Sequence, residues 1–301
     1  MSEPKPLCGV ILADKPEGWT SFDVVAKLRG ITKIKRLGHA GTLDPMATGV
    51  LPVFAGRATA AIDLISDREK RYCAKFALGA MTDTQDSTGA ILKKSDIRVS
   101  EEDIKKILPE FLGEISQIPP MYSAVRVGGR RLYELAREGK TVERSPRKIE
   151  IYKILLSDFS EDSQTGSLEV SCSKGTYIRT LINDIGERLG CFGMMTALRR
   201  TCSQGFDISL CRTLDEIEAA AKEGSLGDIA IPVERCFEGL ARIDLSPAQE
   251  KMFRCGVRLD PERVKISGGR EGLLRVYGGS FLGLAEISPE GLKIKKSFWE
   301  T

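Results

Sequence analysis

A lone carboxylate stands in a glycine-rich stretch beside the single histidine of this 301-residue chain. His39 precedes Asp44 by five residues, and Pro45 follows the aspartate at once. Proline restrains the backbone and favours an extended conformation at the residue before it, and glycine lets a ligand approach closely. A carboxylate held in such a loop can act as a nucleophile or as a base. Taken alone, however, Asp before Pro in a glycine-rich loop also describes an ordinary turn.

The order of residues in this stretch favours the catalytic interpretation. From Gly38 to Gly49 the chain reads G-H-x-G-x-L-D-P-x-A-T-G. This string resembles the uridine loop of the TruB family of pseudouridine synthases, which isomerise the T-loop uridine of tRNA, at position 55. In that family the loop aspartate is the essential catalytic group, so the resemblance implies this role for Asp44. It also implies that His39 fills the space left by a flipped base, as a wedge.

A second candidate lies at the start of an alternating pattern that predicts a strand with one buried face. The alternating positions are Tyr72, Ala74, Phe76 and Leu78. A core tyrosine is the plain interpretation of Tyr72. The preceding K-R and the glycine after the strand again resemble the family, which implies that Tyr72 stacks on the target base and is a candidate to take a proton. Asp83 and Asp86, further on, lack the calcium-loop pattern and are interpreted as an acidic turn.

A third candidate, Arg179, lies in the first turn of a helix expected after Thr176, which is a favourable cap residue. A cation there opposes the helix dipole, so a buried carboxylate partner is expected, and Asp44 is the natural one. Such an arginine typically lowers an aspartate pKa by about 1–3 units. The string C-S-K-G-T-Y-I-R-T-L resembles the family, whose arginine pairs with the catalytic aspartate and whose tyrosine lies beside it. The resemblance implies these roles for Arg179 and Tyr177.

Further residues are candidates for substrate contact. The D-K-P-x-G opening resembles the family near its active cleft, which makes Lys15 a contributor there or else a solvated lysine in a turn. Leu198, within L-R-R, matches the family leucine that packs against the active-site base. Residues 126–148 hold eight Lys or Arg against three Glu, a net charge of +5, and P-P-M-Y-S-A before them resembles the family's mobile thumb. RNA contact is therefore expected from Arg126, Arg130 and Arg131.

The periodicity predicts alternating helices and strands through residue 238. Helices are expected at 20–28, 57–66, 100–111, 131–137, 177–189 and 214–221, and strands at 8–13, 51–54, 70–79, 148–156, 167–173 and 196–201. From about residue 240, short apolar runs at 256–259, 272–277, 280–287 and 291–296 predict a small β-barrel.

The resemblance implies an α+β fold with a mixed, mainly antiparallel sheet, flanking helices and a thumb hairpin at about residues 120–148. It divides the chain into a catalytic domain, residues 1–238, and a PUA-like RNA-binding domain, residues 239–301. The C-terminal barrel is short, so its grip on RNA is a weaker expectation than that of the catalytic domain.

Composition excludes several other kinds of protein. The eight cysteines form no C-x-x-C pair and one histidine cannot complete a zinc cluster, so neither a disulfide framework nor a metal site is expected. No apolar run reaches the roughly 18 residues that span a bilayer, and the N-terminus lacks a signal-peptide pattern. We expect a cytoplasmic monomer that needs no cofactor and no obligatory protein partner, and that acts on the T-arm of tRNA.

Two alternatives stay open at this point. One is a non-catalytic RNA-binding or RNA-folding protein, against which Asp44, Tyr72 and Arg179 argue as a set. The other is the guide-RNA-dependent branch of the same superfamily, which acts as a protein–RNA complex. The short barrel and the thumb favour the enzyme that acts alone, and activity on a bare transcript would distinguish the two.

Overall fold

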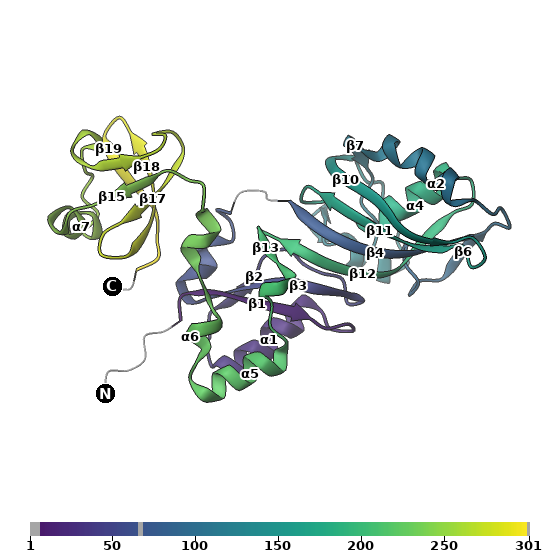
Figure 1. Ribbon diagram of the computed structural model, residues 1–301, viewed down its shortest axis with the longest axis horizontal. Coiled ribbons are helices and arrows are strands. Elements are labelled where there is room, and N and C mark those ends of the chain that lie inside the picture. The colour runs from purple at the N-terminus through teal and green to yellow at the C-terminus, as the bar shows by residue number, and fades with distance from the viewer. Residues whose placement is uncertain (1–6, 66–68, 300–301) are drawn as a thin grey trace.

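A long mixed sheet runs through most of the molecule (Figure 1). The computed structural model describes residues 7–65 and 69–299, and within them the sheet has ten strands. Neighbouring strands are antiparallel except β3 and β12, which run parallel where Ala47 faces Leu198. The strand order is β14 (Ile231–Pro232), β1 (Gly9–Lys15), β3 (Ala47–Ala55), β12 (Gly193–Ser203), β4 (Lys70–Leu78), β11 (Thr165–Cys172), β10 (Arg147–Ser160) and β7 (Gly113–Gln117), with β2 (Leu37–His39) beside β3 and β13 (Phe206–Asp207) beside β12. The expected mixed, mainly antiparallel sheet is confirmed.

Helices cover different parts of this sheet. α1 (Ser21–Thr32) and α5 (Leu214–Glu223) pack against β1 and β3 and share one apolar core with them. α4 (Ile178–Arg188) and α2 (Glu101–Ile107) belong to a second core with β4, β10 and β11. Figure 1 shows α1 and α5 side by side, with α6 (Leu226–Ile229) next to them and α4 and α2 at the other end of the sheet. A cavity lies where these two parts of the sheet meet.

Local sequence explains most helix boundaries. Thr20 caps α1 through a reciprocal capping box with Asp23. The helix continues past its expected end at residue 28 to Thr32, and Lys33 after it adopts the left-handed conformation. α2 has the expected capping box and passes into a 3₁₀ helix, Leu108–Phe111.

Two helix predictions are wrong in detail. The helix expected at residues 57–66 is a shorter 3₁₀ helix, Gly56–Ala61, and its expected last residue, Ser66, lies outside the described residues. The cap of α4 is Tyr177 and not Thr176. The Thr176 hydroxyl donates instead to the Ser173 carbonyl, 3.0 Å away, within the preceding turn.

Two hairpins project from the sheet. β5 (Ala80–Thr82) and β6 (Ile91–Lys94) form a hairpin that sequence periodicity did not indicate. The expected thumb contains β8 (Arg126–Val127), β9 (Arg130–Arg131) and the short α3 (Leu132–Arg137). Gly128 and Gly129 join β8 to β9 with φ of 58° and 84°, a conformation that favours glycine.

The C-terminal part forms a separate sheet. In the described residues its five strands are ordered β16 (Lys265–Ser267), β15 (Arg242–Asp244), β17 (Leu273–Tyr277), β18 (Phe281–Ser288) and β19 (Gly291–Ser297), with α7 (Pro247–Arg254) beside them. No pairing between described residues of β16 and β19 closes this sheet, so the closed barrel expected here is not found. Residues 256–259 form no strand in this part of the structure, although Leu259 bridges to Leu292. β15 and β16 are too short for periodicity to reveal.

An aromatic cluster joins the C-terminal sheet to the rest of the molecule. The ring of Phe237 lies 6.5 Å from that of Phe281 and 5.9 Å from that of Phe298. Phe298 and Phe281 also stack on each other. Figure 1 shows this sheet at the end of the molecule away from β7 and β10. In the part of the chain that the structure describes, no helix has the length and apolar character needed to cross a membrane.

Candidate active site

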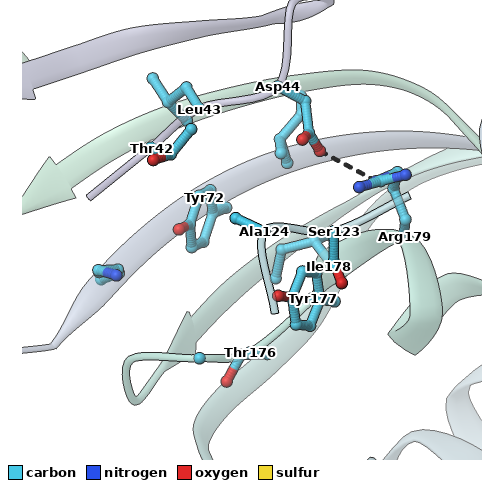
Figure 2. A pocket seen from close by; sticks show the side chains of 13 residues that line it. Thr42, Leu43, Asp44, Tyr72, Ser123, Ala124, Thr176, Tyr177, Ile178 and Arg179 are labelled. Atoms are coloured by element: carbon cyan, nitrogen blue, oxygen red, sulfur yellow. Dashed lines mark ion pairs between the residues drawn. The ribbon is translucent and has the colours of Figure 1, made fainter. Parts of the chain in front are cut away.

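A cavity of about 250 Å³ brings together residues from five distant segments of the chain, one of which is β12 with Leu198. The loop before β3, the start of β4, the segment entering the thumb and the start of α4 each contribute to its wall (Figure 2). Of the predicted residues, the cavity is lined by Asp44, Tyr72, Tyr177, Arg179 and Leu198. It is also lined by Lys70, Ser123, Ala124 and Ile178, which the sequence did not single out.

Arg179 is the fixed centre of this site. It is 4 % exposed, and its Nε lies 2.9 Å from Oδ2 of Asp44, so the expected ion pair is present (Figure 2). Nη1 donates to the Thr84 carbonyl and Nη2 to the Tyr122 carbonyl, each at 2.9 Å. Nη1 also lies 3.6 Å from the carboxylate of Asp86. Each guanidinium nitrogen therefore has a protein partner, and together these contacts fix the orientation of the Arg179 side chain.

The carboxyl of Asp44 does not have the lowered pKa that was expected. Burial raises its pKa above the ordinary value, and the nearby Asp86 carboxylate raises it further. The cations Arg179 and Lys15 oppose this increase without reversing it. The expectation counted the attraction of Arg179 but not the removal of the carboxyl from water, which disfavours the charged form.

Asp86 is a site residue that the sequence analysis interpreted only as part of an acidic turn. It is 5 % exposed, and its Oδ1 accepts hydrogen bonds from the Thr84 hydroxyl at 2.8 Å and from the Thr88 amide at 3.0 Å. The alternation of threonine and aspartate in residues 82–88 was the available signal, because hydroxyl groups next to an aspartate can hold it in a turn. Asp86 thus fixes the hairpin turn whose Thr84 carbonyl positions Arg179.

Replacing Asp86 with asparagine is expected to lower the single-turnover rate of the reaction roughly 10- to 100-fold. The asparagine carbonyl oxygen can keep the hydrogen bonds that Oδ1 accepts from the threonines. The substitution removes the charge beside Arg179, however, and puts an amide that can only donate where Oδ2 faced the guanidinium. Positioning losses of this size accompany small displacements of catalytic groups. Asp83→Asn is the matched control, since Asp83 lies in the same turn and accepts from the exposed Ala90 amide at 2.8 Å. Equal rates for the two variants would contradict a positioning role for Asp86.

Tyr72 lies on the apolar face of β4 and is 8 % exposed. Burial raises the pKa of its phenol, which Arg200 partly offsets, so the phenol is protonated at neutral pH. Arg200 itself is fully buried and ties the loop that holds Asp44 to the sheet. Its Nη2 donates to the Gly41 carbonyl at 2.9 Å and its Nε to the Val50 carbonyl at 2.8 Å. The sequence analysis saw Arg200 only as part of L-R-R and missed this anchoring role.

Lys15 is buried beneath the loop and is not a solvated lysine in a turn, and it is not among the described residues that line the cavity. Its contact with substrate stays a prediction. The residue is 0 % exposed. Its Nζ donates to the carbonyls of Pro16 at 2.8 Å, Trp19 at 2.5 Å and Pro45 at 3.1 Å. Because Pro45 follows the catalytic candidate directly, Lys15 anchors the loop from below. Burial lowers the pKa of Lys15 to about 8.

A Lys15→Met variant is expected to reveal this burial through the pH dependence of stability. The Lys15 pKa falls from 10.5 in the unfolded chain to about 8 in the folded protein, so between these values the unfolded chain binds more protons. Stability rises with pH wherever that holds, by up to about 1.4 kcal/mol per pH unit. Urea unfolding at pH 7 and pH 10 should therefore show wild type gaining stability relative to Lys15→Met. A constant difference would contradict this interpretation.

His39 lies in β2 opposite Val53. His39 is not one of the described residues that line the cavity. Its Nδ1 is buried and has no hydrogen-bond partner in the described part of the chain. Burial and the nearby Arg200 lower its pKa, so the ring is neutral at pH 7. A neutral ring is compatible with a wedge, and nothing in its geometry marks it as an acid or a base.

Tyr177 and Leu198 complete the cavity wall. The backbone of Tyr177 is clamped by Gln117, whose Oε1 accepts from its amide at 2.8 Å and whose Nε2 donates to its carbonyl at 3.1 Å. Gln117 is 2 % exposed and ends β7, so it connects the entry of the thumb to the start of α4. Leu198 faces Ala74 of β4 across the sheet and packs in the core that includes Tyr72.

The thumb arginines are exposed and do not line the cavity in the described part of the chain. Arg130 forms an ion pair with Glu138, and Arg131 donates to the phenol oxygen of Tyr133 at 2.9 Å. Arg126 lies on β8 opposite Arg131. These side chains present positive charge on the surface, and their contact with substrate stays a prediction.

Two family models and many curated relatives match this chain. A family model described as "TruB family pseudouridylate synthase (N terminal domain)" matches residues 29–178, and one described as "tRNA pseudouridylate synthase B C-terminal domain" matches residues 179–238. A curated relative from Clostridium tetani, named tRNA pseudouridine synthase B, is 42 % identical over 290 residues, which are 96 % of this chain and 98 % of the relative. A relative of the same name from Lactococcus lactis is 44 % identical over 83 % of this chain and 78 % of its own length.

Solved structures share the fold. The structure of an H/ACA RNP bound to a substrate RNA containing 2'-deoxyuridine matches with a TM-score of 0.74 and 24 % identity, over 97 % of this chain and 85 % of that one. A Cbf5-Nop10-Gar1 complex matches with the same TM-score of 0.74 at 26 % identity, over 97 % and 85 % of the two chains.

Proposed function

This chain belongs to the TruB family of pseudouridine synthases, and from that premise we propose that it isomerises the T-loop uridine at tRNA position 55. The activity itself, pseudouridine formation in tRNA by an isomerase, follows from the names and the high coverage of the curated relatives. The single observation that carries the assignment of the site is the Asp44–Arg179 ion pair in a cavity that Tyr72 also lines.

Asp44 is the group that acts on the glycosidic bond. The reaction breaks the bond between C1' of the ribose and N1 of uracil, turns the base, and joins C1' to C5. C5 then loses its proton and N1 gains one. No redox partner is required, because the product is an isomer of the substrate. A carboxylate can attack C1' or remove a proton from the adjacent sugar carbon, and both routes need Asp44 ionised and directed by Arg179.

The target uridine must leave the stack to reach Asp44. Flipping a nucleotide costs a few kcal/mol, and stacking on an aromatic ring offsets about 1–3 kcal/mol for each base. Tyr72 is positioned to supply that ring, and its protonated phenol is a candidate to exchange a proton with the rotating base. Tyr177 and Leu198 would close the space around it, while His39 would fill the gap left in the T-loop.

The remaining parts of the chain would hold the RNA. We assign residues 1–238 to catalysis, with a thumb at about residues 120–148 whose net charge of +5 suits a phosphate backbone. Arg126, Arg130 and Arg131 would contact the T-arm when the thumb closes over it. The C-terminal sheet, residues 239–301, would act as a PUA-like module that adds RNA contacts.

We further propose that the enzyme works as a cytoplasmic monomer without guide RNA or protein partner. The likeness to H/ACA and Cbf5 complexes is a likeness of fold. The relatives that match nearly the whole chain are named tRNA pseudouridine synthase B. Purified protein added to a bare T-arm transcript is the direct test. A requirement for a second macromolecule would favour the guide-dependent branch.

Tritium release from a transcript labelled at C5 of uridine tests the reaction, because C5 loses its proton only when the new C–C bond forms. We expect release of one equivalent of tritium per transcript by the wild-type protein. Carbodiimide modification followed by primer extension then maps the pseudouridine. Release from a transcript in which cytidine replaces uridine 55 would contradict the proposed target.

A further inference from the structure

One face of β4 is apolar at every position except the first. Tyr72, Ala74, Phe76 and Leu78 are buried on this face, and Lys70 begins the same row. Since alternate residues of a strand point to the same side, Lys70 and Tyr72 share the face that lines the cavity, and both contribute to its wall. Arg71, between them, is on the opposite face, near Cys202 and Asp207. A cation thus stands beside the ring expected to stack on the target base.

The cavity needs a positive charge that can meet the phosphates of a bound nucleotide. Among the described residues that line it, Lys70 and Arg179 carry positive charge and Asp44 carries negative charge. Every nitrogen of Arg179 is engaged by Asp44, Asp86 or a backbone carbonyl. A nucleotide that enters the cavity brings negatively charged phosphates, and Arg179 has little capacity to meet them. Lys70 is only partly buried, whereas Arg179 is almost fully buried, so a phosphate can approach the Lys70 ammonium. Lysine binds phosphate as a compact point charge.

The position of the ammonium group supports the same role. A Cβ built on Gly41 would lie 3.6 Å from Nζ of Lys70 and 3.4 Å from Nη1 of Arg200. Lys70 therefore reaches the backbone of the uridine loop at a residue whose φ of 78° favours glycine. Residues two apart on a strand are separated by roughly 6.6 Å, which is comparable to the reach from a nucleobase to the phosphates of its own nucleotide.

We propose that Lys70 binds one of the two phosphates that flank the target uridine and so draws the flipped nucleotide onto Tyr72. The inference rests on the proposed function, since it requires a uridine flipped into this cavity. It assigns Lys70 to substrate positioning and leaves the bond changes to Asp44. The row Lys70–Tyr72 then recognises one nucleotide through its phosphate and its base together.

Neutral phosphates provide the test. T-arm hairpins are prepared with a methylphosphonate, which removes one charge, at either phosphate flanking uridine 55. Dissociation constants and single-turnover rates are measured for wild type, Lys70→Met and Lys70→Arg. With the natural hairpin, Lys70→Met should bind at least about tenfold more weakly, as expected for a lost hydrogen bond to a charged group. Lys70→Arg should restore most of the affinity.

The decisive comparison is between the effects of a methylphosphonate on RNA binding by wild type and by Lys70→Met. One of the two methylphosphonates should weaken binding by wild type about tenfold and leave binding by Lys70→Met nearly unchanged, because the interacting pair is already broken. The slope of log K against log salt should also become shallower by about 0.7–0.9 for Lys70→Met. Arg71→Met is the matched control, since it removes a charge one residue away on the opposite face, and it should keep the wild-type response to the methylphosphonate.

Two results would overturn the proposal. Equal sensitivity of wild type and Lys70→Met to both methylphosphonates would show that Lys70 meets neither phosphate. Normal binding and turnover by Lys70→Met would exclude any positioning role. A failure of the proposed function is distinguishable from either result, because wild type would then fail to convert the unmodified T-arm hairpin.

Discussion

Asp44→Asn is expected to reduce the isomerisation rate by about 10⁴-fold or more, since removing the nucleophile of an enzyme commonly has effects of that order. Asparagine has nearly the same shape, so the hydrogen-bonding surroundings of Arg179 change little, but it can neither attack C1' nor accept a proton from the sugar. Single-turnover tritium release with excess enzyme measures the loss without interference from product release.

The RNA affinity and the unfolding temperature of Asp44→Asn show whether its defect is chemical or structural. Asp44→Asn should bind the T-arm with an affinity close to that of wild type and should unfold at a similar temperature. Burial disfavours the charged form of this carboxyl, so removing its charge is not costly in itself. Arg179 keeps Asp86 and the carbonyls of Thr84 and Tyr122 as partners. Turnover above about one hundredth of the wild-type rate would contradict the central role given to Asp44, whatever its affinity for RNA.

Arg179→Lys is expected to lower the rate by about 10²–10³-fold, a loss typical for removing one preorganised donor in an active site. Lysine keeps the charge, but its ammonium cannot reproduce the planar geometry that joins Asp44, Thr84 and Tyr122. The comparison measured is the single-turnover rate, with the melting temperature as a check on folding. A near-normal rate would show that charge alone suffices at this position.

The pH dependence of activity in variants of Arg179 and Asp86 tests whether these two residues set the pKa of Asp44. Activity requires ionised Asp44, so it is lost as pH falls through the pKa of that carboxyl. Arg179 lowers this pKa and Asp86 raises it. The acid limb should therefore move to higher pH in Arg179→Met and to lower pH in Asp86→Asn, with Arg179→Lys closer to wild type. Shifts in one common direction would contradict this account of Asp44.

Local patterns made several parts of this structure predictable. The buried face of β4 follows from strict alternation at residues 72–78, because adjacent strand residues point to opposite sides. The start of α2 follows from the Ser100–Asp103 capping box. The partner of Arg179 could be inferred from its position in a first helical turn, where a cation needs a compensating carboxylate.

Other parts depended on which distant segments meet. Asp86, Gln117 and Lys70 are ordinary polar residues in sequence, and they belong to the site only because β4, β7, the β5–β6 hairpin and α4 converge there. The short apolar runs after residue 240 were expected to close into a barrel, but the five strands described there form an open order, because closure depends on strand pairing that apolar runs do not specify.

The sequence by itself determined the family, the catalytic candidates Asp44, Tyr72 and Arg179, and most of the elements that carry them, because these depend on residue type, order and local periodicity. Only the tertiary structure decided that Lys15 is a buried anchor and that the Asp44 pKa is raised. Both results depend on burial. The free energy of a charge is set by how far surrounding segments exclude water from it, and no spacing along the chain contains that information.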